Sequence, residues 1–304
     1  MAHFGATMVL AALAAVGQEP GLLGEGADWR EIPFAIVDAR PLIEARVNGT
    51  PGRMMFDTGT PLTVLVNRDA VALPGGDDSR TGHVASGQSV DIRNHVAVPI
   101  EFGGMGIAAG RVLISGNFGF TEVAFGEDFL GFVGTPAVEG GAFLLDYGRQ
   151  VLTVLGTDES GALAVGPPAA GEVVARFSFV REEGEQPTTG AFIGSLPLVL
   201  DFDTGDGGTL HLRPETRASL EAEGALVVEG DEAVLRALRF GGAVFENVTV
   251  EIVEAGGTED GRAWSGSNAL RLGAGFLSEH PSLWNYPAGT ITILKPDAAF
   301  LAPR

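Results

Sequence analysis

Cysteine is absent from this chain of 304 residues. Disulfide bonds, thiolate nucleophiles and cysteine-ligated zinc or iron–sulfur centres are therefore excluded. By itself, this absence does not fix the cellular compartment.

Motifs of several common enzyme classes are also missing. The five histidines are scattered and form no H-E-x-x-H pair, so a zinc-protease helix has no support. No G-x-S-x-G, P-loop or G-x-G-x-x-G sequence occurs, which leaves a serine-hydrolase elbow and a nucleotide cradle without support. We therefore expect neither a metal ion nor a cofactor.

Basic residues are few compared with acidic ones. The chain has 19 Lys and Arg against 39 Asp and Glu, which gives a net charge of −20. Such a surface repels phosphate backbones, so nucleic acid is not expected as a partner. Hydrophobic residues make up 45% of the chain, which is enough for two lobes with a core each.

Long hydrophobic runs are lacking as well. The apolar stretch at residues 4–16 is shorter than the roughly 20 residues that span a bilayer, so no stable membrane anchor is expected. Its small residues resemble a signal-peptide core and cleavage site, although no Lys or Arg precedes it. The sequence predicts a signal peptide and tail over residues 1–27 and a periplasmic or secreted protein. A disordered alanine-rich tail is the alternative, which leaves a cytoplasmic location open.

One short motif occurs twice. An apolar run leads into Asp57-Thr58-Gly59 and another leads into Asp203-Thr204-Gly205. Each copy is typical of a buried strand that ends in an acid and a tight turn. A single Asp-Thr-Gly is more often a plain turn, but burying an ionised acid at a strand end twice for structure alone is unfavourable.

The spacing of other residues indicates an internal duplication. The two aspartates are 146 residues apart, the phenylalanines of two Phe-Gly-Gly sequences (Phe102 and Phe240) are 138 apart, and the two tyrosines (Tyr147 and Tyr286) are 139 apart. We also match Leu130-Gly131 with Leu272-Gly273. A spacing shared over so much of the chain is stronger evidence than any one motif.

The chain divides at a segment rich in Gly, Ala and Pro. We predict a first lobe over residues 28–157, a linker over 158–171 and a second lobe over 172–304. Short strands dominate both lobes, and the polar stretch at 79–94 is predicted to form a projecting hairpin. A short helix is expected at residues 67–72 and another at 212–221.

These features resemble the pepsin-like and retropepsin-like aspartic proteases, in a bacterial-type two-lobe form, over about residues 30–300. The resemblance implies an all-β, bilobed pepsin-like acid protease fold, with two related β-barrel-like lobes and a cleft between them. It also implies a flap from the first lobe, a peptide or protein substrate, and hydrolysis without a metal or covalent intermediate. A monomer is expected, since both acids lie in one chain.

The resemblance assigns roles to individual residues. Asp57 and Asp203 match the catalytic pair. The residues expected to support the two catalytic loops are Thr58, Gly59, Thr60, Thr204, Gly205 and Asp206. The residues expected to bind substrate from the flap are His83, Ser86 and Gly87.

The chemistry of such a pair follows from electrostatics. Two carboxyl groups a few ångströms apart share one proton and titrate together, as the aspartic-protease dyad exemplifies. The ionised member takes a proton from water while the protonated member donates to the scissile carbonyl. The sequence therefore predicts an aspartic endopeptidase.

Three positions differ from the family pattern. Asp206 stands where Ser, Thr or Ala is usual, and it either raises the proton affinity of the pair or points to solvent. The presumed flap has no tyrosine, and Arg271 interrupts the apolar strand of the second lobe. A catalytically inactive, aspartic-protease-like peptide-binding protein is therefore the alternative function.

Overall fold

The structure is a computed structural model that describes residues 22–23, 26–77, 79–83, 89–107, 110, 112–180, 187–230, 232–253 and 268–303. Most of the predicted signal segment lies outside these residues, so export stays a prediction. No helix in the described ranges is both long and apolar enough to cross a bilayer.

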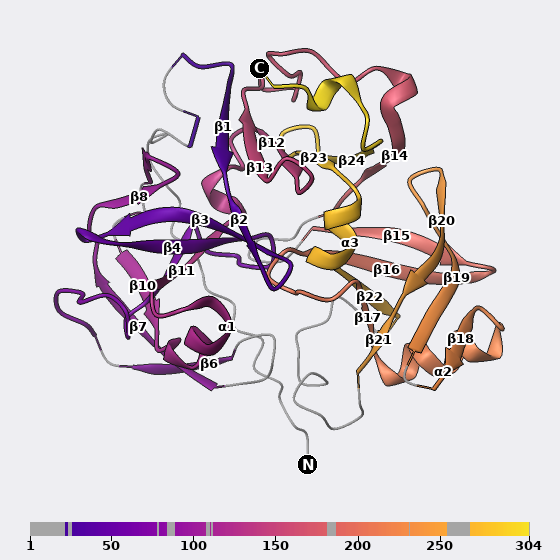
Figure 1. Ribbon diagram of the computed structural model, residues 1–304, viewed down its shortest axis with the longest axis horizontal. Coiled ribbons are helices and arrows are strands. Elements are labelled where there is room, and N and C mark those ends of the chain that lie inside the picture. Colours follow the sequence, from indigo (N-terminus) through magenta and orange to yellow (C-terminus); the bar gives the residue numbers. More distant parts are fainter. Residues whose placement is uncertain are drawn as a thin grey trace.

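The first half of the chain builds a curled sheet of ten described strands, which we call the first lobe (Figure 1). Its strands, in order along the sheet, are β6 (Arg80–His83), β7 (Ser89–Val96), β10 (Val112–Gly116), β5 (Val64–Asn67), β11 (Phe129–Gly134), β4 (Thr50–Asp57), β3 (Arg40–Val47), β8 (Ile100–Phe102) and β9 (Met105–Gly106), with β2 (Ala35–Val37) beside β3. The hairpin between β3 and β4 turns at Asn48 and Gly49, whose φ angles of 48° and 83° fit the Asn-Gly turn of a tight hairpin.

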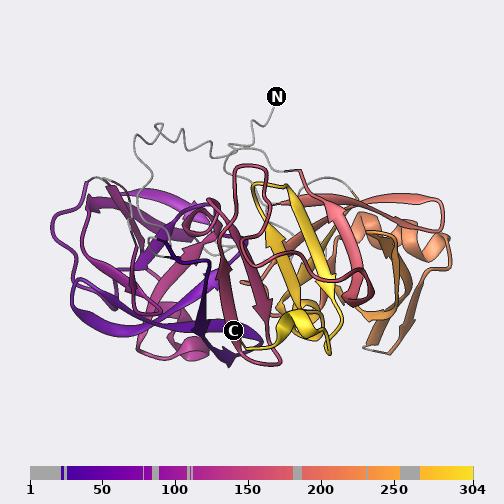
Figure 2. The same ribbon diagram turned by 90° about the horizontal axis from the view of Figure 1, so that it is seen from above.

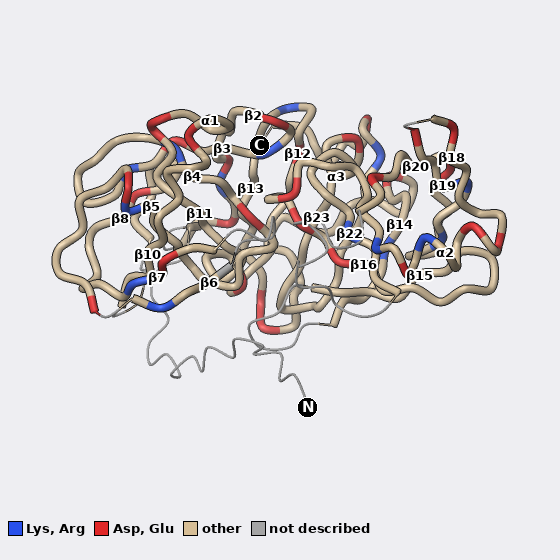
Figure 3. The backbone as a smooth tube through the Cα atoms, turned by 90° about the horizontal axis from the view of Figure 1, so that it is seen from below, with Lys and Arg blue, Asp and Glu red and all other residues tan. Residues whose placement is uncertain are grey.

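The second half builds a sheet of eight described strands, the second lobe. Its strands are β18 (Leu226–Glu229), β19 (Glu232–Phe240), β15 (Thr188–Ile193), β16 (Leu196–Asp203), β22 (Ala269–Gly273), β17 (Leu210–Leu212) and β21 (Glu251–Ile252), with β20 (Ala243–Thr249) beside β19. The expected all-β, bilobed fold is confirmed. Figure 3 shows acidic residues spread over both lobes.

A third sheet joins the two lobes and lies between them in Figures 1 and 2. Its six strands run in the order β1 (Trp29–Pro33), β13 (Val151–Leu155), β12 (Ala142–Asp146), β23 (Ser282–Asn285), β24 (Thr290–Leu294) and β14 (Val173–Ser178). Three strands come from each half of the chain, and the order is symmetric about the antiparallel β12–β23 pair. The duplication seen in the sequence therefore continues through this sheet.

The helices are few and short. They are α1 (Glu122–Phe125), α2 (Pro214–Ala222), α3 (Ala274–Glu279) and the 3-10 turns η1 (Gly119–Thr121), η2 (Thr135–Ala137), η3 (Ala170–Glu172) and η4 (Ala299–Leu301). The predicted helix at 212–221 is confirmed as α2, with Pro214 at its first position. The helix expected at residues 67–72 is wrong: the chain turns there, held by backbone bonds from Ala70 and Val71 back to Asn67.

One sequence match is also wrong. In the parallel pair β4–β11, the residue opposite Asp57 is Gly134, and in β16–β22 the residue opposite Asp203 is Gly273. The counterpart of Gly273 is therefore Gly134 rather than Gly131. A β-carbon at Gly134 would stand 2.2 Å from the carbonyl oxygen of Thr60, so the strand needs glycine where the loop after Asp57 passes over it.

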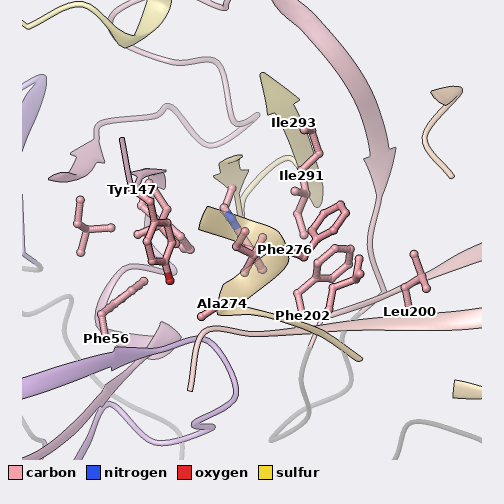
Figure 4. Close-up of a cluster of buried hydrophobic side chains, with 14 of the residues drawn as sticks. Phe56, Tyr147, Leu200, Phe202, Ala274, Phe276, Ile291 and Ile293 are labelled. Atoms are coloured by element: carbon pink, nitrogen blue, oxygen red, sulfur yellow. The ribbon is translucent and has the colours of Figure 1, made fainter. Parts of the chain in front are cut away.

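The hydrophobic core continues beneath the ends of β4 and β16 (Figure 4). Phe56 packs edge-on against Phe143 at 5.1 Å between ring centroids, and Phe202 packs likewise against Trp284 at 5.7 Å. Phe143 and Trp284 stack on each other across the shared sheet at 5.3 Å. This row of four buried rings fixes the two strand ends relative to each other.

Candidate active site

Each lobe delivers one aspartate at the carboxyl end of a buried strand. Asp57 ends β4 and Asp203 ends β16, and both are almost fully buried, with 8% and 4% exposure. A tight turn follows each acid, closed by a backbone bond of 3.2 Å from residue 60 to residue 57 and from residue 206 to residue 203. Each copy of the Asp-Thr-Gly motif therefore forms the predicted arrangement of a buried strand, an acid at its end and a tight turn.

Two threonines tie the loops together. The backbone N–H of Thr58 donates to Oγ1 of Thr204 at 2.9 Å, and the N–H of Thr204 donates to Oγ1 of Thr58 at 3.0 Å. Each hydroxyl then donates to the opposite strand, Thr58 to the carbonyl of Phe202 and Thr204 to the carbonyl of Phe56. These four buried bonds hold the two acids at a fixed separation.

The carboxyl groups are hydrogen-bonded to each other and to their own loops. Oδ1 of Asp57 accepts from the N–H of Gly59 at 2.8 Å, and Oδ2 accepts from the hydroxyl of Thr60 at 2.6 Å. Oδ1 of Asp203 accepts from the N–H of Gly205 at 2.9 Å, and its side chain is bonded to that of Asp57. The predicted pair is thus brought together.

Burial and the neighbouring negative charge of Asp203 raise the pKa of Asp57 from 3.8 to about 7. The hydrogen bonds from Thr60 and Gly59 favour the charged form and oppose this rise. Asp57 therefore carries a proton in mildly acidic solution, and the second carboxyl group lies beside it. A pair in that state can both accept and donate a proton.

Asp206 neither points to solvent nor joins the pair. Its carboxyl group is buried, and Oδ2 lies 2.7 Å from Nδ1 of His211. The other ring nitrogen of His211 lies 3.0 Å from Oε2 of Glu251, which is exposed. Within the described ranges, no group of three His, Asp or Glu side chains is arranged to hold a metal ion.

The burial of Arg271 in an apolar strand is explained by Asp201, a residue that was not among the sequence-predicted site residues. Arg271 lies opposite Asp201 in the parallel β16–β22 pair, and its Nε donates to Oδ1 of Asp201 at 2.8 Å. Burial alone would lower the pKa of Arg271, but the charges of Asp201 and Asp203 raise it above its usual range. The sequence signal was present, since one acid and one base interrupt two apolar strands.

Arg40 connects the first lobe to the loop that follows Asp203 in the second lobe. Its Nε donates to the carbonyl of Gly205 at 2.8 Å, and it is paired with Asp38 in the preceding turn. Asp38 and Ala39 both have positive φ, 49° and 63°, so this turn is strained for Ala39. A hollow of about 250 Å³ opens here, lined by Asp38, Arg40, Asp206, Gly207, Gly208, His211 and Glu251.

The flap residues are only partly described. β6 and β7 pair antiparallel with residue 83 opposite Ser89, so the two arms of the expected hairpin are formed. Ser86, Gly87 and the side chain of His83 lie outside the described residues, and their contact with substrate stays a prediction.

Comparisons with known proteins bear on the fold. No protein-family model and no curated protein sequence matches the chain. Among solved structures, the crystal structure of an aspartic proteinase from Irpex lacteus matches with a TM-score of 0.56, over 90% of this chain and 98% of that chain, at 12% sequence identity. The pepsin-like fold is therefore confirmed, whereas the retropepsin-like or bacterial-type variant stays a prediction.

Proposed function

We propose that this protein is an aspartic endopeptidase in which Asp57 and Asp203 together activate a water molecule. The observation that carries the proposal is the pair of buried, mutually hydrogen-bonded carboxyl groups, one from each lobe, of which Asp57 has a pKa raised to about 7. A buried pair of carboxyl groups is rarely needed to stabilise a fold, whereas acid–base catalysis makes use of one.

The reaction follows from one proton shared by two acids. The carboxylate accepts a proton from water, whose oxygen attacks the scissile carbonyl carbon, while the protonated carboxyl donates its proton to the carbonyl oxygen. As the tetrahedral intermediate collapses, one of its hydroxyl groups returns a proton to the carboxyl group that had donated, and the C=O bond re-forms. The carbon–nitrogen bond breaks, and the amine leaves with the proton taken from water. The carboxyl groups end in their starting state, and both product chains leave without a covalent enzyme intermediate.

The binding-only alternative is not favoured. It would gain support if Asp206 displaced the pair, but the carboxyl of Asp206 faces His211. The threonine bonds that hold the loops are also intact. A monomeric enzyme acting on peptides or proteins fits this arrangement, since one chain supplies both acids.

Cleavage of a mixed peptide library between pH 3 and 8 tests the proposal. The native chain is compared with Asp57→Asn and Asp203→Asn, with Asp297→Asn at an exposed position as the matched control. We expect either active-site substitution to lower kcat/KM by at least about a thousandfold, as loss of a group acting in a catalytic unit does, and the control to cleave normally. Peptide binding without cleavage by the native chain would leave the alternative in its place.

A further inference from the structure

The two carboxyl groups of the pair sit in unlike surroundings. Their lobes are related by the duplication, so each neighbour of Asp57 has a counterpart beside Asp203. Two residues before each acid stand Met55 and Asp201, and opposite them in the paired strands stand Phe132 and Arg271. The first lobe thus has an apolar pair where the second has a buried ion pair.

The buried ion pair lies directly against one acid. Arg271 is 2% exposed and Asp201 is fully buried, and besides its bonds to Asp201 the guanidinium approaches Asp203, with 3.8 Å between Nε and Oδ2. In a buried site, a cation at this distance favours the ionised form of a carboxyl group.

The third residue after each acid is also neutral in the first lobe and acidic in the second. In the first lobe it is Thr60, whose hydroxyl donates to Asp57. In the second lobe it is Asp206, which faces His211 and adds a further negative charge to those that surround Arg271. Asp57 therefore has a neutral donor, whereas Asp203 has the guanidinium end of a buried ion pair beside it. A charge–charge interaction in a buried site is stronger than a hydrogen bond between neutral groups.

We propose that Arg271 fixes the order of charge in the pair, so that Asp203 is the ionised member and Asp57 carries the shared proton. On the proposed function, on which this part rests, Asp203 is then the base toward water and Asp57 the acid toward the carbonyl. Arg271 is a positioning residue, because it acts through Asp203.

Other ionisable groups near this cluster bear on the outcome. On the outer side, His211 lies between Asp206 and the exposed Glu251, so it links the buried cluster to solvent. On the side of the shared sheet, Tyr147 interacts with the charges of Asp203 and Arg40, and burial raises the pKa of Tyr147, which stays neutral in the relevant range. The guanidinium of Arg271 is in direct ion-pair contact with Asp203.

The first test needs no catalytic activity. Asparagine is a neutral stand-in for a protonated aspartate, so the acid that already holds the proton should tolerate it better. At pH 6 we expect Asp203→Asn to melt at least about 5 °C below Asp57→Asn, because only the former takes a carboxylate away from Arg271. Equal melting temperatures, or the reverse order, would overturn the proposal.

A second comparison identifies Arg271 as the cause. The double substitution Asp201→Met and Arg271→Phe copies the first lobe's Met55–Phe132 pair, and in that background the difference between the two Asn variants should vanish. The matched control removes another ion pair, between Arg53 of β4 and Asp128 in the turn before β11, with Arg53→Gln and Asp128→Asn, and should keep the difference. A difference that persists without Arg271, or is lost in the control background, contradicts the proposal.

If the double variant does not fold, Arg271→Lys takes its place in the test. It keeps the cation and should keep the order of the two Asn variants, with a smaller gap; a reversed order would overturn the proposal.

The catalytic arm separates this inference from the proposed function. If the chain cleaves peptides, the acidic limb of kcat/KM in the folded double variant should move upward by about one pH unit, because Asp203 then takes the second proton more readily. An unmoved limb would refute the role of Arg271 while leaving the endopeptidase intact. If the chain cleaves nothing, the proposed function fails, and the melting comparison still decides the order of charge.

Discussion

Thr58 and Thr204 exchange hydrogen bonds in both directions across the two lobes, each N–H donating to the other's hydroxyl within 3.0 Å. Because both hydroxyls also donate to buried carbonyl groups, each threonine has its polar atoms satisfied only when the lobes are joined. The same four bonds therefore stabilise the interface and set the distance between the acids.

Thr58→Val should lower the free energy of unfolding by roughly 2–4 kcal/mol, because it removes a buried hydroxyl and leaves the N–H of Thr204 and the carbonyl of Phe202 unsatisfied. Thr58→Ser retains the hydroxyl and should lose less than about 1 kcal/mol. Urea unfolding of both variants measures the difference. Equal losses would mean that the methyl group rather than the hydroxyl matters.

Gly205 lies against the carboxyl group of Asp57. A β-carbon there would stand 2.7 Å from its Cγ and Oδ1, closer than van der Waals contact permits. We expect Gly205→Ala to push the pair apart and to lower kcat/KM by at least about a hundredfold, since small misplacements have that effect. The control is Gly190→Ala, where the added carbon meets nothing within 4 Å. Full activity of the Gly205 variant would contradict the close approach.

Stability should fall as the pH rises through the range in which Asp57 titrates. Its pKa is 3.8 in the unfolded chain and about 7 in the native chain, so the native state binds the extra proton between these values. Stability from this group is present at the acidic end and lost toward neutral pH. Asp57→Asn removes the dependence and should be more stable than the native sequence by roughly 2–4 kcal/mol at pH 8. Unfolding curves from pH 4 to 8 measure it, and parallel curves for the two proteins would refute it.

Removal of one half of the buried ion pair should be worse than removal of both halves. Arg271→Phe leaves the charge of Asp201 buried without its partner, which costs roughly 3–5 kcal/mol. Adding Asp201→Met replaces the whole ion pair with an apolar pair and should recover most of that loss of stability. Chemical denaturation of the single and double variants gives the coupling energy. Additive losses would show that the two side chains are independent.

The turn that presents Arg40 is strained at one residue. Ala39 has a φ of 63°, in the left-handed region where a β-carbon is unfavourable. Ala39→Gly should therefore raise the free energy of unfolding by about 0.5–1 kcal/mol, whereas Ala39→Val should lower it. Thermal unfolding checks the order of the three proteins, and a destabilised glycine variant would show that the turn is not strained.

Much of the candidate site could be predicted from the sequence because the residues that specify it are adjacent in the chain. An Asp-Thr-Gly after an apolar strand specifies the acid, the turn and the threonine within a few residues, and the second copy indicates the two-fold arrangement. The Asn-Gly hairpin between β3 and β4 is local in the same way.

The remainder depends on pairing between distant strands. Asp201 and Arg271 are 70 residues apart, and each alone only interrupts an apolar strand; their register in the parallel pair makes them partners. The match of Gly273 with Gly131 has another cause, since both Gly131 and Gly134 follow apolar residues, but the 139-residue spacing of the two tyrosines points to Gly134. Only Gly134 lies opposite Asp57.

The shared sheet has a consequence for how the protein is made. β12 of the first half takes β23 as its neighbour, and β23 begins only at residue 282. During synthesis, the edge of β12 and the face of Phe143 must wait for Trp284, which leaves the ribosome 141 residues later. A nascent first lobe therefore exposes an unpaired strand edge for longer than its length alone requires, and such edges promote misassembly. Truncation before residue 282 should give an aggregating fragment rather than a stable single lobe.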